Sequence, residues 1–405
     1  MKARRLTAVL CTIITIALAA SCTNSEKQNE KAKYIFLFIG DGMGNSHVAA
    51  TESYLSYKAG KLGGEELLFT GFPYLGLCTT YSANANVTCS SAAGTAIACG
   101  EKTNNSMLGM APDSSRLKSV AYDLKEDGYR IGIMSSVTIN HATPASFYAS
   151  TPNRDNYYEI SQQIPASGFE YFAGAGFVQY NGKDGQQEAT DTFLEKNGYK
   201  VCYGVKEFKE NADKCDKIVF SQESNRKTSA GNYVSSDSEM DNASLATMVQ
   251  QAIDFLGTEK PFFIMCEGGE IDWKAHDNKT MPMIQDVLEF DDAVRTAYEF
   301  YLEHPEETVI VVTADHETGG ISLGVRGGSR SMNWEKLEQQ WIENGKKNTL
   351  DKEANQALNT SCSIGWTSYG HTGAPVPVYA IGKGAERFNG RLDNTEIKGK
   401  LLGKE

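Results

Sequence analysis

Short runs of consecutive apolar residues recur along the chain, and stretches with helical periodicity lie between them. The first run, at 34–39, ends directly before Gly40. Every position in this run is apolar, which is typical of a strand buried on both faces, as in a parallel sheet. Comparable runs occupy 130–134, 261–266, 308–313 and 376–381.

The intervening segments carry apolar residues at the three- and four-residue spacings of amphipathic helices. These predicted helices cover 46–57, 114–127, 245–256 and 283–302. Strands that alternate with helices predict an α/β fold, doubly wound, with a mostly parallel central sheet and helices on both faces. In such folds, ligands bind beyond the carboxyl ends of the strands.

Two stretches depart from this pattern. Residues 160–240 are polar and Gly-rich, and residues 325–366 are polar apart from a short helical pattern at 334–344. We expect both to be insertions that decorate a single catalytic domain spanning 34–405, a length that one large α/β domain can have.

The N-terminus has the features of an export signal. Lys2, Arg4 and Arg5 precede an apolar run at 6–20, which is too short and wrongly flanked for a stable membrane span. We therefore predict a signal peptide at 1–21.

The end of this segment, Ala-Ala-Ser-Cys22, resembles a bacterial lipoprotein cleavage site, with Leu18 one place further upstream than the common pattern. On this interpretation Cys22 carries a lipid, and polar residues 22–33 form a flexible tether. The protein would then be exported to the bacterial periplasm or cell envelope and held on a membrane. The alternative is a secreted protein with a chance cysteine at this position.

Net charge and cysteine content indicate which partners the protein could bind and whether it could form disulfides. A net charge of −12 argues against a nucleic-acid partner but not against small anionic substrates, because bound cations can reverse the local field.

Of nine cysteines, seven remain after Cys11 and Cys22, so at least one thiol stays unpaired. We predict a disulfide between Cys202 and Cys215. The surroundings of Cys78, Cys99 and Cys266 indicate plain core thiols.

Two acid–imidazole pairs are candidate metal ligands. Asp272 and His276 are four residues apart, so a helix would place both on one face, where they could hold zinc. A surface helix with chance charges is the alternative. Asp315 and His316 follow the apolar run at 308–313, and a buried strand rarely ends in two titratable side chains unless something satisfies them.

Three further candidates lie beside glycines. Asp41 is flanked by Gly40 and Gly42, Glu267 precedes two glycines, and His371 lies between Gly370 and a following Thr-Gly. Glycines let the backbone turn tightly and approach an ion closely, although each signal is weak alone. Two other histidines carry no such signal, and we expect His47 on an exposed helix face and His304 as an exposed helix cap.

The segment 88–100 offers a nucleophile. Thr88, Ser90 and Ser91 are N-cap residue types before a run of small residues, and a hydroxyl at a helix N-terminus lies where an anion is favoured. A capped Ala-rich core helix is the alternative, and spacing does not choose among the three hydroxyls. Arg154 could hold two phosphate oxygens with its planar fork, or form a surface ion pair with Asp155.

Taken together, these segments resemble the alkaline phosphatase family from about residue 34 to 390. The matching blocks, in the family's order, are Ile-Gly-Asp41-Gly-Met-Gly, Val-Thr-Cys-Ser90-Ser-Ala-Ala-Gly-Thr-Ala, His141-Ala-Thr143-Pro-Ala, Arg154, Glu267-Gly-Gly-Glu-Ile-Asp272-Trp-Lys-Ala-His276, Thr-Ala-Asp315-His316 and Gly370-His371-Thr-Gly.

The resemblance implies a role for each matching residue. Ser90 falls at the nucleophile and Arg154 at the phosphate clamp. Two Zn²⁺ ions and one Mg²⁺ are implied, with ligands Asp272, His276 and His371 for the first zinc, Asp41, Asp315, His316 and Ser90 for the second, and Asp41, Thr143 and Glu267 for magnesium. The implied activity is hydrolysis of small phosphate monoesters through a phosphoserine at alkaline pH. Because dimers are common in the family, a homodimer is a further expectation.

Three residues depart from the pattern of well-known bacterial members. Cys89 stands where many have an Asp that helps position the clamp arginine. His141 stands where the best-known member has Asp, and Trp273 where it has Lys. With the imidazole of His141 nearby, the third site could also accept Zn²⁺.

Other functions in the wider superfamily fit less well. A sulfatase needs Cys-x-Pro-x-Arg where this chain has Cys89-Ser-Ser-Ala-Ala. A phosphodiesterase would not need Arg154 as a clamp for a doubly charged terminal phosphate. A non-catalytic envelope protein that sequesters zinc or phosphate would be indicated by a lost ligand or nucleophile, and none is lost.

Overall fold

The computed structural model describes residues 31–223, 242–346 and 350–404. The predicted signal peptide at 1–21, Cys22 and most of the tether at 22–33 lie outside the described residues.

A ten-stranded sheet forms the centre of the molecule, in the order β14-β2-β13-β8-β1-β7-β3-β4-β6-β5. β13 runs antiparallel to β8 and β2, and the other pairs are parallel, which confirms the predicted sheet. The strands are β1 (Tyr34–Gly40), β2 (Tyr74–Thr79), β3 (Arg130–Ser135), β4 (Tyr171–Gly174), β5 (Lys200–Tyr203), β6 (Ile218–Ser221), β7 (Phe262–Gly268), β8 (Thr308–Thr313), β13 (Val376–Gly382) and β14 (Gly390–Asp393).

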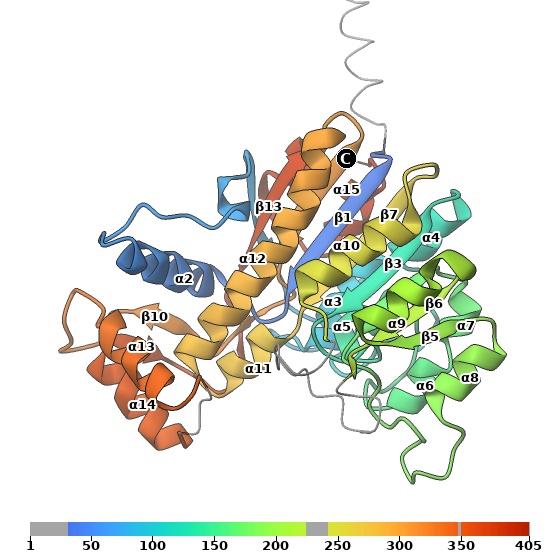
Figure 1. The fold of residues 1–405 in the computed structure, drawn as a ribbon. Coiled ribbons are helices and arrows are strands. Elements are labelled where there is room, and N and C mark those ends of the chain that lie inside the picture. The colour runs from blue at the N-terminus through green and yellow to red at the C-terminus, as the bar shows by residue number, and fades with distance from the viewer. Residues whose placement is uncertain (1–30, 224–241, 347–349, 405) are drawn as a thin grey trace, which may run out of the picture.

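Helices cover both faces of this sheet, which is why β1, β7 and β8 are buried at every position. In Figure 1, α12 and α10 lie together in front of β1 and β7, and α3 lies behind the sheet with α5. The helices are α2 (Asn45–Lys58), α3 (Ser90–Cys99), α4 (Val120–Glu126), α5 (Ala142–Ala145), α6 (Tyr157–Ser161), α7 (Ile164–Ser167), α8 (Thr190–Lys196), α9 (Gly204–Asn211), α10 (Leu245–Leu256), α11 (Glu270–His276), α12 (Thr280–Glu303), α13 (Trp334–Glu343), α14 (Lys352–Ser361) and α15 (Glu396–Leu401).

Small elements complete the fold. Two two-stranded sheets pair β10 (Ile321–Leu323) with β11 (Ile364–Trp366) and β12 (His371–Thr372) with β9 (Glu317–Thr318), and short 3₁₀ turns cover Phe69–Gly71, Ala212–Lys214 and Ala385–Phe388. Among the described residues, no helix is both long and apolar enough to cross a bilayer.

The two irregular stretches have different structures. The described part of 160–240 contains β4, β5 and β6, which extend the central sheet at one edge. Each of these strands has four residues, too few to give a clear periodic signal. Residues 325–366 contain α13 and α14, which lie with β10 beside α2 in Figure 1.

One predicted helix is shorter than expected. The helix predicted at 114–127 begins at Val120, because Ser114 has a φ of 70° and closes a turn with Ala111 instead. In contrast, the helix predicted at 245–256 has those bounds in the structure.

The predicted disulfide is wrong. Cys202 and Cys215 are free, like the other cysteines in the described part of the chain. Cys202 is fully buried in the core on β5, whereas the Cys215 thiol donates a hydrogen bond to the Asn211 carbonyl oxygen at 3.4 Å. Cys78 and Cys266 are buried core thiols as predicted, and Cys99 is half-buried.

The prediction for His47 is also wrong. His47 is fully buried, its Nδ1 accepts a hydrogen bond from the Gly44 amide at 3.2 Å, and its ring lies edge-on to Trp366 at 5.8 Å. Trp366 is more than 300 positions away in sequence, so nothing local could have indicated this burial. His304 follows α12 as its C-terminal cap and is half-buried against the rings of Tyr34 and Phe300.

Candidate active site

Three neighbouring parallel strands end at one edge of the sheet and carry the candidate residues there. In the strand register Ile39 of β1 lies beside both Glu267 of β7 and Thr313 of β8. Asp41 and Asp315 each follow two residues after these positions, so the carboxylates converge at the carboxyl ends of the strands, as expected for this fold class.

The first group of ligand atoms comes from α11 and β12. His276 Nε2 lies 3.4 Å from Asp272 Oδ2, and His371 Nε2 lies 3.7 Å from Asp272 Oδ1. Each Nδ1 faces a backbone carbonyl oxygen, that of Tyr369 at 2.5 Å for His276 and that of Thr88 at 2.9 Å for His371. These bonds orient both rings with Nε2 toward Asp272, an arrangement that suits zinc.

The second group is fully buried. His316 Nε2 lies 3.3 Å from Asp41 Oδ1, 3.2 Å from Asp315 Oδ2 and 3.3 Å from Ser90 Oγ. Neither carboxylate oxygen of Asp41 has a hydrogen-bond partner, and Asp315 Oδ2 has none either. Buried carboxylate oxygens without partners are costly, so a cation fits here. Asp41, Asp272 and His316 can all place ligand atoms within 4.8 Å of one another, so Asp272 borders both groups.

A third group of ligand atoms lies around Glu267. Ligand atoms of Asp41, His141 and Glu267 lie within 4.8 Å of one another. His141 Nδ1, Thr143 Oγ1 and Glu267 Oε1 are all buried without a hydrogen-bond partner. Oxygen donors from Asp, Glu and Thr suit Mg²⁺, and the additional imidazole makes the site compatible with zinc.

The geometry distinguishes the three candidate hydroxyls. The Ser90 hydroxyl faces His316 from the first residue of α3. In contrast, the Thr88 hydroxyl donates to the Cys89 carbonyl oxygen at 3.1 Å, and Ser91 Oγ lies 3.2 Å from Cys89 Sγ. Ser90 is therefore the hydroxyl directed at the His316 imidazole, which lies beside the carboxylates of Asp41 and Asp315.

Arg154 approaches the same site beside His141. Arg154 Nη2 lies 3.4 Å from His141 Nε2. The His141 ring stacks on Tyr157 at 6.4 Å and meets Trp273 edge-on at 5.7 Å. Sequence reasoning missed Tyr157, which had no signal beyond its position three residues after Arg154.

The comparison with known proteins now identifies the family. The family model described as alkaline phosphatase matches residues 32–179 and 223–402. The chain belongs to the alkaline phosphatase family. Alkaline phosphatase 4 of Bacillus subtilis is 30% identical, with 98% of this chain and 95% of that protein covered. Alkaline phosphatase 3 of the same organism is 31% identical, with coverage of 96% and 94%.

Solved structures agree with this assignment. The alkaline phosphatase of the Antarctic bacterium TAB5 matches with a TM-score of 0.74 at 30% identity, covering 92% of this chain and 98% of that one. The Thermus thermophilus alkaline phosphatase matches with a TM-score of 0.73 at 25% identity, covering 93% of each chain. The chain is thus a phosphatase, and its family acts on phosphate monoesters.

Within this alkaline phosphatase fold, Thr318 links the first two ligand groups and was missed from the sequence. Its hydroxyl donates to Asp272 Oδ1 at 2.5 Å and lies 3.2 Å from His316 Nδ1. Gly42 approaches it so closely that an added Cβ would lie 2.9 Å from Thr318 Oγ1. Gly42 also has a φ of 72°, so both the space and the backbone conformation require glycine.

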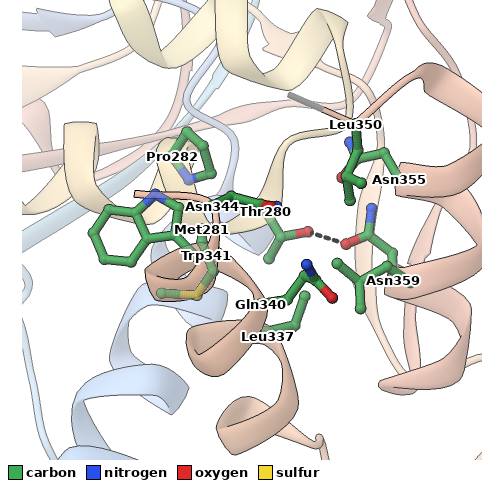
Figure 2. A pocket seen from close by; sticks show the side chains of 11 residues that line it. Thr280, Met281, Pro282, Leu337, Gln340, Trp341, Asn344, Leu350, Asn355 and Asn359 are labelled. Atoms are coloured by element: carbon green, nitrogen blue, oxygen red, sulfur yellow. Dashed lines mark hydrogen bonds between the residues drawn. The ribbon is translucent and has the colours of Figure 1, made fainter. Parts of the chain in front are cut away.

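The segment that follows His276 is held by the α13–α14 region. Figure 2 shows the small pocket between these helices and the start of α12, where the Thr280 hydroxyl donates to Asn359 Oδ1 at 2.8 Å. The side-chain amides of Asn355 and Asn359 each donate to the Asn278 carbonyl oxygen at 2.8 Å. The polar stretch 325–366 therefore braces the turn after α11.

Burial dominates the electrostatics of the site. It raises the pKa of Asp315 to about 7 and that of Glu267 to about 8, and it raises the pKa of Asp41 well above its usual range. Burial also lowers the pKa of His141 to about 3. In Asp272 the effect of burial is outweighed by the hydrogen bond from His276 and by nearby imidazoles, which hold its pKa below the usual range. Bound cations would compensate these carboxylates.

Proposed function

We propose that the chain hydrolyses phosphate monoesters to an alcohol and inorganic phosphate through a phosphoserine at Ser90. The reaction would run at alkaline pH at a centre of two zinc ions and one magnesium ion. The observation that carries this proposal is the position of Ser90 Oγ, 3.3 Å from His316 Nε2, which itself lies 3.3 Å from Asp41 Oδ1 and 3.2 Å from Asp315 Oδ2, two buried oxygens that have no hydrogen-bond partner.

The donor set fits these metals. The residues that would hold them are Asp272, His276 and His371 for the first zinc, Asp41, Asp315 and His316 with Ser90 for the second, and Asp41, Thr143 and Glu267 for magnesium, with His141 within reach. A TAB5 alkaline phosphatase variant has Mg bound in its M3 site, which supports a magnesium-type third site. Bound ions supply charge stabilisation for the entering and leaving oxygens of an in-line displacement.

The chain's own groups bind and orient the phosphoryl group. Ser90 begins α3, where free backbone N–H groups and the helix dipole favour an anion. The Arg154 guanidinium would hold two non-bridging oxygens. The Ser90 hydroxyl gives its proton to water, and Oγ forms a bond to phosphorus while the bond from phosphorus to the alcohol oxygen breaks and that oxygen takes a proton from water. Water then cleaves the phosphoserine, which releases inorganic phosphate and restores the hydroxyl.

Replacing the nucleophile tests this proposal. The Ser90→Ala variant should lose p-nitrophenyl phosphate turnover by about a thousandfold or more, while zinc content measured by mass spectrometry persists. Ser91→Ala is the matched control and should keep most of the turnover, because the Ser91 hydroxyl contacts Cys89. Unchanged turnover in Ser90→Ala would overturn the phosphoserine assignment.

Location and assembly are a separate part of the proposal. The Ala-Ala-Ser-Cys22 ending of the export signal supports a lipid-anchored protein of the periplasm or cell envelope. Cys22→Ser should move the protein from the membrane fraction to the soluble fraction and prevent labelling with radioactive palmitate. We also propose a homodimer on the basis of the family, to be checked by light scattering of the purified protein.

A further inference from the structure

Glu317 follows the ligand pair Asp315 and His316 directly, yet its carboxylate belongs to none of the three ligand groups. The side chain is buried on β9. Its Oε1 accepts the Gly320 N–H at 2.8 Å, and its Oε2 accepts a hydrogen bond from the Thr372 hydroxyl. Both oxygens of this buried carboxylate are therefore engaged by neighbouring segments of the site.

The hydroxyl of Thr372 connects Glu317 with the segment that carries His371. Thr372 follows His371, and both belong to β12. β12 pairs with β9 in a register that places Thr372 opposite Glu317. Beyond this ladder, the Gly319 N–H donates to the Gly370 carbonyl oxygen at 2.9 Å. Two residues per strand make a very short ladder, so the side-chain bond is a substantial part of the connection between β9 and β12.

This bond joins the chain neighbours of two stacked imidazoles. His316 directly precedes Glu317, and His371 directly precedes Thr372. The ring centroids of His316 and His371 lie 3.6 Å apart, with an angle of 22° between the ring planes. In the proposed site these two rings bind different zinc ions, so their relative position links the first ligand group to the second.

Glu317 also contacts the segment that carries Asp41. Gly44, three residues after Asp41, approaches so closely that an added Cβ would lie 2.2 Å from Glu317 Cγ. On the same segment, His47 Nδ1 lies 3.8 Å from Glu317 Oε1. Burial lowers the pKa of His47 to about 4, so near neutral pH this imidazole is not a cation that pairs with the carboxylate. The position of Glu317 thus depends on its hydrogen bonds and on close packing.

We propose that the bond between Glu317 and Thr372 positions the His371 imidazole against its counterpart in the second zinc site. This inference rests on the proposed function, in which His371 and His316 hold different zinc ions. His316 is fully buried, whereas His371 is partly open to solvent, so loss of the bond should displace His371. Charge on the leaving oxygen develops only in the transition state, so this displacement should lower kcat more than it raises KM.

The experiment breaks the bond with Thr372→Val, which removes the hydroxyl and keeps the shape of the side chain. Competition with a chromophoric chelator measures zinc affinity, and p-nitrophenyl phosphate gives kcat and KM of the metal-loaded enzyme. The affinity for the more weakly held zinc should fall about tenfold, as for other partners of metal ligands. The value of kcat should also fall about tenfold, while KM changes by less than about twofold.

Variants of the same pair sharpen the test. Thr372→Ser keeps the hydroxyl and should restore zinc affinity and kcat to within about twofold of the parent. Glu317→Gln replaces one accepting oxygen with an amide that donates, so an intermediate loss of about threefold is expected, again in kcat rather than KM. The loss in the double variant should fall short of the combined single losses, because both changes act on one bond. Glu317→Gln decides alone if Thr372→Val does not fold.

Thr367→Val is the matched control. The Thr367 hydroxyl donates to the carbonyl oxygens of Gly319 and Gly320, at 3.4 and 3.3 Å. This variant removes a threonine hydroxyl from the same turn without touching the bond between Glu317 and Thr372. Its zinc affinity and turnover should match those of the parent.

Parent-like zinc affinity and kcat in Thr372→Val, fully additive losses in the double variant, or no rescue by Thr372→Ser would overturn the inference. His371→Ala, measured in parallel, separates this result from the proposed function. If His371→Ala lowers zinc affinity and Thr372→Val does not, the positioning role alone fails. If His371→Ala leaves zinc affinity unchanged, the assignment of His371 as a zinc ligand fails as well.

Discussion

The two ends of the metal-binding region are built differently. Around Asp272, the imidazoles of His276 and His371 are partly open to solvent, and backbone carbonyl oxygens fix both rings. Around Glu267 the side chains of Asp41, Thr143 and Glu267 are fully buried, and donor atoms of His141 and Thr143 have no partner. The first end is thus preorganised by the protein, whereas the second depends on a bound ion for its own stability.

Removing the bound metal ions should have the largest effect, on both turnover and thermal stability. A chelator should reduce turnover by a thousandfold or more, on the order expected when the charge-stabilising groups are lost, and should lower the Tm because buried carboxylates become uncompensated. Differential scanning calorimetry and assays after zinc and magnesium add-back check this. Ser90→Ala should show the same Tm change, and a chelator without effect on either quantity would contradict the prediction.

Preorganisation at the Asp272 end can be tested through Thr318. Thr318→Val removes the hydroxyl that donates to Asp272 Oδ1 while keeping the shape of the side chain. Zinc affinity should fall about 10- to 100-fold, as for other partners of metal ligands, measured by competition with a chromophoric chelator. Thr51→Val, which removes a buried hydroxyl that bonds to the His47 carbonyl oxygen, is the control and should bind zinc normally.

The dependence of the Glu267 end on an ion should appear as a pH effect in the metal-free protein. Burial raises the pKa of Glu267 from its ordinary 4.5 to about 8, so the folded state binds a proton that the unfolded state has released. The free energy of unfolding should therefore fall as pH rises from about 4.5 to about 8, by about 1.4 kcal/mol per pH unit. Denaturant titrations measure this slope.

Glu267→Gln provides the matched variant for that experiment. Because the amide does not titrate, the slope should become shallower between pH 4.5 and 8. An unfolding free energy that rises with pH in the metal-free parent would contradict the prediction.

The smallest expected effect concerns the choice of ion at the buried end. His141→Ala removes the one imidazole of the third group and leaves the oxygen donors Asp41, Thr143 and Glu267. Zinc should then compete with magnesium about tenfold less well, because oxygen ligands favour magnesium. Metal analysis after equilibration with both ions gives the ratio, and Trp273→Phe, which keeps an aromatic ring beside His141, is the control.

The five neighbouring strands β13, β8, β1, β7 and β3 were predictable because their signal is local, whereas the other five strands of the sheet were not predicted. A run of consecutive apolar residues such as 34–39 shows by itself that both faces of a strand are covered. The strands predicted at 130–134 and 308–313 have bounds within one residue of the observed ones. The exposure of His47 was predicted wrongly because its burial depends on Trp366, far away in the chain. The pairing of Cys202 was predicted wrongly because this thiol is buried in the core on β5 while Cys215 bonds to a backbone carbonyl oxygen.

The sequence alone determined which residue types could bind metal, and the resemblance of the motif order to the alkaline phosphatase family determined the family. Residue types and the ends of apolar runs are local properties, so they can be identified from the sequence without a structure. The family resemblance placed Ser90 at the nucleophile, and the tertiary structure showed that its hydroxyl, rather than that of Thr88 or Ser91, faces His316. The tertiary structure alone decided that Thr318 bridges two ligand groups. Thr318 and Asp272 are 46 positions apart and Ser90 and His316 are 226 positions apart, and such contacts arise only when the packed sheet brings the segments together.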